Sequence, residues 1–341
     1  MEQKNTIYDI AKALNITAAT VSRALNNNPK ISENTRKLVL ETAAKMNYKQ
    51  NKLAKSLRNG KSFNVGVIVP RIDSNFFASV IRGVEDELHP EGYHVIICQT
   101  HEDEKREIDN ITTLLNAQVD GILMSISKMS EENEPIIKRV VKNNVPFIFF
   151  DRKKSIDGVS SVTIDDFEGG YLATKNLIEQ GCTKIAHLCG DQSLEIYQNR
   201  LKGYKQALLD NGLKYNQDYV IQTKSNLDAG KNAVVQLLAL NEVPDAIFSS
   251  SDFAALGAIQ ELKERGVKIP DEFCVFGFGN EPFTRYLELS ISSVDQSPLE
   301  MGKMAAKVFM EQINNTDNIK IEKKVVLKPE LQIRQSSTRS N

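Results

Sequence analysis

The chain contains two series of short apolar runs that alternate with segments of helical periodicity. The first series comprises NVGVIVP, HVIICQT, VDGILMS and PFIFFD, and the second comprises KIAHLCG, DAIFSSS and FCVFGF. Runs of this kind are typical of buried strands, and their alternation with helices predicts parallel sheets covered by helices. Two series predict two α/β lobes. Such sheets bind ligands beyond the carboxyl ends of their strands, and a cleft between two lobes can close on a small molecule.

A different pattern fills the first 47 residues, where three short amphipathic helices are expected. Thr6 and Asp9 resemble a capping box at the start of a first helix. Thr17 can cap a second helix from about 18 to 26, and Ser32 can cap a third helix that ends near 47. Two helices separated by about three residues form a helix-turn-helix, so this segment predicts a small all-α domain that reads DNA.

The predicted second helix carries small, almost uncharged side chains where a surface helix usually carries Glu and Lys. In a helix-turn-helix, the start of this helix enters the DNA major groove, where small side chains permit a close approach to base edges. Ala18 and Ala19 can contact thymine methyl groups, and Arg23 can read a guanine through two hydrogen bonds. Thr17 and Ser22 can bond phosphate. The sequence therefore predicts that this face lies against DNA.

Charge is distributed unevenly along the chain, although the net charge is only −1. Residues 1–60 carry eleven Lys and Arg against four Asp and Glu, a net charge of +7, and the remainder carries 32 basic against 40 acidic residues, a net charge of −8. A basic N-terminal block joined to an acidic body is typical of a protein in which one small domain contacts a polyanion. A merely solvated Lys-rich surface is the alternative interpretation.

Candidate catalytic and metal-binding motifs in the chain fail at required positions. The segment NGKS has Lys55 where a phosphate-binding loop needs its first glycine, and GFGNEP has Pro282 where a dinucleotide fingerprint needs its third. The four cysteines and four histidines form no ligand cluster, so we expect reduced core thiols and neither a metal nor a cofactor. The adjacent Asp165 and Asp166 are expected in a solvated loop. The sequence therefore predicts no catalytic residues and no enzyme.

No stretch approaches the ~20 consecutive apolar residues of a membrane span. Residues 1–15 alternate polar and apolar side chains and do not resemble a signal peptide. With 341 residues, of which 41% are apolar, we expect a globular protein of two or three domains in the cytoplasm, without membrane contacts and associated with the nucleoid through DNA.

Specific motifs resemble the LacI/GalR family of bacterial transcription regulators, the lactose-repressor type. TIYDIAKALNITAATVSRALN, KISENTRKLVLETAAKMNY and NKLAKSLRNGKS resemble its DNA-binding domain and hinge. The resemblance continues in VGVIVPRIDSNFFASVIRGVED, VPFIFFDR, DDFEGGYLATKNLIEQG, NRLKGYKQAL, SSSDFAALGAIQELKERGVKIPDEFCVFGF and SSVDQSPLEMG. It implies an all-α helix-turn-helix domain followed by an α/β domain like a periplasmic binding protein, with two parallel-sheet lobes and three crossovers near residues 161, 291 and 321.

The resemblance and the patterns together divide the chain into three parts. We expect the helix-turn-helix domain in residues 1–49, the hinge helix and linker in 50–61, and the effector-binding and dimerisation domain in 62–341. Within the last part, we expect the N-lobe in about 62–161 and 291–320, and the C-lobe in about 162–290 and 321–341.

The resemblance also implies which residues contact DNA. Two hinge helices of a dimer pair in the minor groove at the operator centre, where Leu57 is expected to wedge between base steps. Packing of Leu53 and Leu57 on the helix-turn-helix domain is the alternative. The expected DNA-binding residues are Thr6, Tyr8, Thr17, Ala18, Ala19, Thr20, Ser22, Arg23, Asn26, Lys30, Asn51, Ala54, Leu57 and Arg58.

An effector site in the cleft is implied in the same way. Arg200 matches the family's cleft arginine, which bonds sugar hydroxyls or anionic groups, and Asp252 either contacts the ligand or caps the helix that follows it. One of Phe76 and Phe77 is expected to stack on the ligand and the other to lie in the core. Gly279 stands where the family commonly has Asp. The expected effector-binding residues are Asp73, Ser74, Phe76, Phe77, Asp151, Ile196, Arg200, Asp252, Gly279 and Asn280.

The sequence therefore predicts a ligand-responsive transcription regulator. We expect a homodimeric repressor of a carbohydrate-utilisation operon, which binds a pseudo-palindromic double-stranded DNA operator. A small-molecule effector, a sugar or sugar derivative bound between the lobes, is expected to change its operator affinity. Two alternatives are a transport-type small-molecule-binding protein, which would share the two-lobe body, and a regulated enzyme with a DNA-binding appendage.

Overall fold

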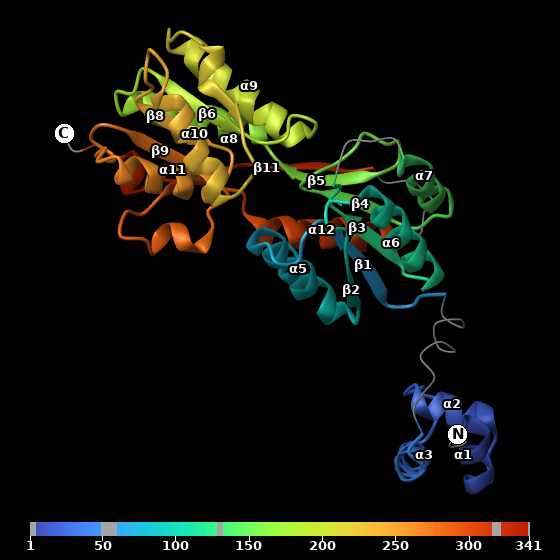
Figure 1. The fold of residues 1–341 in the computed structure, drawn as a ribbon. Coiled ribbons are helices and arrows are strands. Elements are labelled where there is room, and N and C mark those ends of the chain that lie inside the picture. Colours follow the sequence, from blue (N-terminus) through green and yellow to red (C-terminus); the bar gives the residue numbers. More distant parts are fainter. Residues whose placement is uncertain (1–4, 49–59, 128–131, 316–321, 340–341) are drawn as a thin grey trace. The chain divides into compact units, whose positions relative to one another are not determined.

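The computed structural model describes residues 5–48, 60–127, 132–315 and 322–339. The chain forms two compact units, Met1–Ser62 and Phe63–Asn341 (Figure 1). No helix in these described ranges is long and apolar enough to cross a membrane.

The N-terminal unit contains α1 (Ile7–Leu14), α2 (Ala18–Leu25) and α3 (Glu33–Lys45). The predicted caps are confirmed: Thr6 and Asp9 form a capping box, and the backbone N–H groups of Thr20 and Thr35 donate to the Thr17 and Ser32 hydroxyls. The three helices bury one small core of Ile10, Ala11, Val21, Ala24, Val39 and Ala43. Helix α3 ends at Lys45, slightly earlier than predicted.

The N-lobe of the second unit is built on a parallel sheet, whose strand order in the described residues is β11-β5-β4-β3-β1-β2. Its strands are β1 (Asn64–Val69), β2 (His94–Gln99), β3 (Gly121–Met124), β4 (Phe147–Phe150), β5 (Ser160–Ile164) and β11 (Lys324–Leu327). Helices α5 (Asn75–Leu88) and α12 (Pro298–Ile313) pack on one face, and α6 (Glu104–Asn116) and α7 (Glu134–Lys142) pack on the other (Figure 1). Apolar side chains therefore point from both faces into cores, which explains the continuous apolar runs.

The C-lobe has a similar plan, and the strand order of its sheet in the described residues is β12-β10-β9-β8-β6-β7. Its strands are β6 (Ile185–Cys189), β7 (Val220–Gln222), β8 (Ala246–Ser249), β9 (Cys274–Phe278), β10 (Ser292–Asp295) and β12 (Glu330–Gln332). Helices α8 (Asp166–Glu179) and α9 (Glu195–Asp210) cover one face, and α10 (Leu227–Leu238) and α11 (Asp252–Glu264) cover the other. Strand β12 pairs antiparallel with β10, and the other pairs are parallel.

Short 3-10 helices complete the described elements: η1 (His89–Glu91), η2 (Gln217–Tyr219), η3 (Pro282–Arg285) and η4 (Gln335–Ser337).

The three crossovers between the lobes lie further along the chain than predicted. The chain leaves the N-lobe sheet after Ile164, leaves the C-lobe sheet after Asp295, and crosses again after Leu327, instead of near 161, 291 and 321. The reason is strand pairing, because β5 runs on beside β4 and β11, while β10 runs on beside β9. The predicted lobe boundaries were therefore wrong by a few residues at each crossover.

The cysteines of the described chain are free thiols. Cys182, Cys189 and Cys274 are buried, and Cys98 is half-buried. Within the described ranges, no three His, Cys, Asp or Glu side chains are grouped so that they could hold a metal ion.

Candidate DNA interface and effector pocket

The small face predicted on α2 points outward from the N-terminal unit. Thr17, Ala19 and Arg23 are exposed, while Val21 and Ala24 lie in the core on the opposite side of the helix. Most of the other predicted DNA-binding residues of this unit are also accessible. Thr6, Tyr8 and Lys30 are exposed, and Ala18, Thr20, Ser22 and Asn26 are half-buried. The predicted hinge residues Asn51, Ala54, Leu57 and Arg58, together with Leu53, lie outside the described residues.

Some of these polar side chains also shape α2 itself. The hydroxyls of Thr17 and Thr20 lie 2.9 Å apart at its start, and the Asn26 amide donates to the Ser22 carbonyl at 2.6 Å at its end. The first bond links two side chains, and the second satisfies a backbone carbonyl that the helix end leaves open. Arg23 is the one basic side chain of α2, and its neighbours on this face are small.

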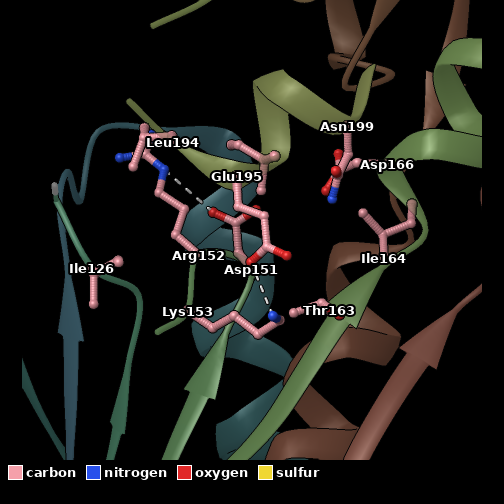
Figure 2. Close-up of a pocket in the computed structure, with 11 residues that line it drawn as sticks. Ile126, Asp151, Arg152, Lys153, Thr163, Ile164, Asp166, Leu194, Glu195 and Asn199 are labelled. Atoms are coloured by element: carbon pink, nitrogen blue, oxygen red, sulfur yellow. Dashed lines mark hydrogen bonds and ion pairs between the residues drawn. The ribbon is translucent and has the colours of Figure 1, made fainter. Parts of the chain in front are cut away.

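A pocket that opens to solvent lies where the two lobes of the second unit meet (Figure 2). Residues from the N-lobe, from the first crossover and from the start of α9 form its wall. They are Ile126, Asp151, Arg152, Lys153, Thr163, Ile164, Asp166, Leu194, Glu195, Ile196 and Asn199. The wall combines aliphatic side chains with charges of both signs, which is suited to a small polar ligand.

Asp151 follows the last residue of β4, as the sequence predicted. Its backbone is left-handed, with φ of 59°, and its N–H donates to the Val162 carbonyl of β5 at 3.0 Å. Asp tolerates this conformation better than most residues. The carboxyl group is 5% exposed and accepts a hydrogen bond from the Ser125 hydroxyl at 3.3 Å. Burial raises the pKa of Asp151 above its usual value, even though Arg152 and Arg200 lower it.

The two residues after Asp151 bring positive charge to the pocket. Arg152 donates to both carboxylate oxygens of Glu102, at 2.9 and 3.2 Å. Lys153 Nζ lies 2.9 Å from Glu195 Oε2, and this ion pair joins the loop after β4 to the first residue of α9, across the two lobes (Figure 2). Both side chains of the Lys153–Glu195 pair are partly exposed, so it contributes about 0–1 kcal/mol to stability.

Arg200 is buried beside the pocket and bonded to protein groups. Its Nε donates to Asp166 at 2.7 Å, and its two terminal nitrogens donate to the Ser250 carbonyl at 3.1 Å and to Gln296 at 3.2 Å. The guanidinium carbon lies 3.6 Å from the centroid of the Phe278 ring, a cation–π contact. Arg200 thereby joins α8 after the first crossover to Gln296 in the second crossover.

Gly170 and Gly203 allow helices α8 and α9 to pack closely. A Cβ atom at Gly170 would lie 2.3 Å from the Arg200 carbonyl oxygen, and one at Gly203 would lie 2.1 Å from the Phe167 carbonyl oxygen. Helices α8 and α9 can therefore approach closely enough to set Arg200 against Asp166.

Asp166 corrects a prediction from the sequence. The Asp165–Asp166 pair was expected in a solvated loop, but Asp165 caps α8 and Asp166 is 4% exposed at the first turn. Burial raises the pKa of Asp166 to about 6, although the Arg200 guanidinium lowers it.

The other predicted effector residues are distributed unevenly. Ile196 lines the pocket with Asp151. Phe77 lies in the N-lobe core, with the partly buried Phe76 packed on it at a ring distance of 5.1 Å. Ser74 is the N-cap residue of α5. Asp73 forms an exposed ion pair with Arg71 at 2.8 Å. The pocket wall includes none of Asp73, Ser74, Phe76 and Phe77.

Asp252, Gly279 and Asn280 lie together beyond the strands of the C-lobe sheet, outside the pocket wall. Asp252 is the first residue of α11 and not its N-cap, which is Ser251. Its carboxylate accepts hydrogen bonds from the backbone N–H of Glu281 at 2.8 Å and from the Ser293 hydroxyl at 2.7 Å, so both oxygens are occupied. Gly279 has φ of 126°.

Asn280 connects the C-lobe segments at the second and third crossovers. Its amide nitrogen donates to Asp295 at 2.8 Å, and its oxygen accepts from Arg334 at 2.7 Å. The Asn280 side chain is therefore engaged with the protein in this structure.

Sequence reasoning missed six charged or polar wall residues, and four of them had a local signal. Arg152 and Lys153 directly follow Asp151, and Glu195 and Asn199 are spaced to lie on one side of a helix beside Ile196 and Arg200. Thr163 and Asp166 had no such signal, because the polar strand β5 was not predicted.

Comparisons with known proteins agree with this arrangement. A family model described as periplasmic binding proteins and sugar binding domain of LacI family matches residues 62–329, and one described as bacterial regulatory proteins, lacI family, matches residues 6–51. The HTH-type transcriptional regulator DegA of Bacillus subtilis (strain 168) is 32% identical over 338 residues, which cover 99% of each chain.

Solved structures extend the similarity to the whole fold. The transcriptional regulator CelR in its cellobiose complex is 26% identical with a TM-score of 0.73, and the match covers 98% of this chain and 100% of that one. The lac repressor dimer bound to operator and the anti-inducer ONPF has a TM-score of 0.86 at 20% identity, with 99% and 100% coverage, which supports the fold. The chain therefore belongs to the LacI family of bacterial regulatory proteins and is a DNA-binding transcription regulator, not an enzyme.

Proposed function

We propose that the protein is a cytoplasmic, homodimeric repressor of a carbohydrate-utilisation operon. A sugar or sugar derivative binds in the pocket between the lobes and changes operator affinity. The observation that carries this proposal is the pocket wall, because Lys153 belongs to one lobe and Glu195 to the other. A ligand that contacts both lobes stabilises one relative position of the lobes over others. The relative complexed with cellobiose and the lac repressor dimer on its operator support the same assignment.

The proposed DNA contacts are the exposed face of α2 and the hinge segment predicted from the sequence. Arg23 reads a base edge, and the small residues around it allow the helix to approach the groove. Asp151, Asp166 and Ile196 of the pocket wall, with Arg200 buried beside it and paired with Asp166, form the proposed effector site.

Operator binding should depend strongly on salt. The +7 charge of residues 1–60 is present twice in a dimer, so several phosphates are neutralised by each copy. Because log K falls by ~0.9 for each neutralised phosphate per unit of log salt, we expect a slope of about −4 or steeper. The measurement is operator affinity by fluorescence anisotropy over a salt series, with and without candidate sugars.

Arg23→Lys is the matched control, because it keeps the charge and removes the paired hydrogen bonds to guanine. We expect an unchanged salt slope and a loss of preference for operator over random DNA by about tenfold or more. A slope near −1, or operator affinity that no sugar alters, would contradict the proposed function.

A further inference from the structure

The charges around the pocket are unevenly matched. Two cations, Arg152 and Lys153, belong to the pocket wall, and a third, Arg200, is buried beside it. Each of these three side chains has a carboxylate within hydrogen-bond distance. Arg152 bonds Glu102 at 2.9 Å, Lys153 bonds Glu195 at 2.9 Å, and Arg200 bonds Asp166 at 2.7 Å. The fourth carboxylate, Asp151, has no cation at that distance.

The contacts that Asp151 does make are long. Arg152 Nε lies 3.7 Å from its Oδ2, beyond a normal hydrogen bond, and the Ser125 hydroxyl lies 3.3 Å from the same atom. The Nε atom is itself buried without a hydrogen-bond partner among the described residues. Arg152 is therefore shared between two carboxylates, with hydrogen bonds to Glu102 and only a longer ion pair to Asp151.

Asp151 is also fixed in place. Its side chain is nine-tenths buried, it lines the pocket, and the left-handed backbone after β4 aims it there (Figure 2). Burial removes this carboxylate from water, and its ion pair with Arg152 is long and shared with Glu102, so a ligand cation at hydrogen-bond distance would offset more of the lost solvation.

An anionic ligand group fits this arrangement poorly. The wall already carries three carboxylates, Asp151, Asp166 and Glu195, against two cations. Their partners outside the wall, Glu102 and Arg200, bring the count to four carboxylates against three cations, so an anion would add to the excess negative charge. To reach Lys153 it would have to displace Glu195, and it would lie near Asp151, whose only ion pair is the long one with Arg152. A cationic group meets the opposite situation, because its partner is already buried and aimed at it.

We propose that the effector is a small polyhydroxylated molecule with a protonated amino group, such as an amino sugar, and that its ammonium binds the Asp151 carboxylate. The inference rests on the proposed function, since it names the ligand class of the same pocket. Asn199 and Thr163 offer hydrogen bonds to hydroxyl groups, and Ile126, Ile164, Leu194 and Ile196 cover the apolar edges of such a ring.

The test uses the full-length protein and three matched hexose series. Each of the glucose, galactose and mannose series contains the neutral sugar, its 2-amino derivative, the N-acetylated amine and the 6-phosphate. Calorimetry gives Kd for each compound. In at least one series we expect the amine to bind at least tenfold more tightly than the neutral sugar, which is about 1.4 kcal/mol, and N-acetylation to remove that gain because it removes the charge.

Asp151→Asn is the decisive variant. Asn tolerates the left-handed backbone and has nearly the same shape, so the substitution removes only the charge. We expect the preference for the amine over the neutral sugar to fall below threefold in this variant. Asp86→Asn, which removes an exposed carboxylate on α5 away from the pocket wall, should leave the preference unchanged.

Three results would overturn the amine assignment: tighter binding of a neutral or phosphorylated sugar, a preference that survives in Asp151→Asn, or no binding by any amine. These results differ from a failure of the proposed function. If a neutral or phosphorylated sugar binds and alters operator affinity, the repressor assignment stands and only the ligand class is wrong.

Discussion

Arg200 forms a buried ion pair with Asp166, whereas Arg71 forms an exposed one with Asp73, and both pairs have N–O distances below 3 Å. We expect Arg200→Ala to lower the free energy of unfolding by about 3–5 kcal/mol, because it leaves the Asp166 carboxylate buried without its partner. Arg71→Ala should cost less than about 1 kcal/mol. Urea unfolding of the two variants measures the difference, and equal losses would mean that Asp166 finds another partner or loses its charge.

For single residues, the sequence predicted where a side chain lies better than which groups it bonds. The family resemblance placed Arg200 at the cleft, but it gave no sign that Asp166, Ser250 and Gln296 occupy its nitrogens. Asp165 and Asp166 were interpreted as a loop because neighbouring residues of an extended segment point in opposite directions. A helix starts between them, so one became a cap and the other a buried charge.

Helix packing determines whether Arg200 reaches its partners. In Gly203→Ala the added methyl group would meet the Phe167 carbonyl oxygen at 2.1 Å, a backbone atom that cannot move aside without shifting α8. We expect a loss of about 1–3 kcal/mol in unfolding free energy and weaker effector binding, because α9 moves away from α8. Lys202→Ala, at the exposed preceding residue, is the control and should change stability by less than about 0.5 kcal/mol. Stability equal to that of the parent would mean that the helices are not constrained at this contact.

Among the strands, the apolar ones could be predicted from the sequence and the polar ones could not. Apolar strands such as β1 and β4 were found from their sequence, because burial on both faces requires continuous apolar residues. The polar strands β5 and β10 gave no such pattern, and the crossovers were misplaced around them. Ser160, for example, is buried because its hydroxyl accepts hydrogen bonds from Gln312 and from the Lys323 backbone, residues more than 150 positions away. Local sequence cannot show partners at that separation.

The whole chain combines buried ionisable groups that oppose one another as pH changes. Burial raises the pKa of Asp166 and of Asp252 to about 6, and burial and the nearby Asp252 raise that of Glu281 to about 7. The folded chain keeps these protons at pH values where the unfolded chain has lost them, so each acid contributes stability at low pH that is lost as pH rises through its folded pKa. Burial also raises the pKa of Glu107 and Asp151.

His187 acts in the opposite direction. It is fully buried and stacked on Tyr204 and Phe248, and burial lowers its pKa to about 3. Its contribution to stability is complete above the unfolded pKa of about 6.5 and is lost as pH falls toward 3. As pH falls from about 7 to 5, His187 therefore lowers the stability of the fold, while at least three buried acids raise it.

We therefore expect the protein to be more stable at pH 5 than at pH 7, with a higher urea midpoint at the lower pH. The effect of the acids is larger, because between pH 7 and pH 5 the folded chain takes up more protons than the unfolded chain. Wherever the folded state binds more protons than the unfolded state, stability rises as pH falls. Asp252→Asn should reduce the difference between the two midpoints. An amide can still accept from the Glu281 N–H and can donate to the Ser293 hydroxyl, so the contacts remain while one titrating group is removed. Asp86→Asn, at an exposed site, should leave the difference intact. A lower midpoint at pH 5 in the parent protein would mean that His187 and the surface ion pairs outweigh the buried carboxyl groups.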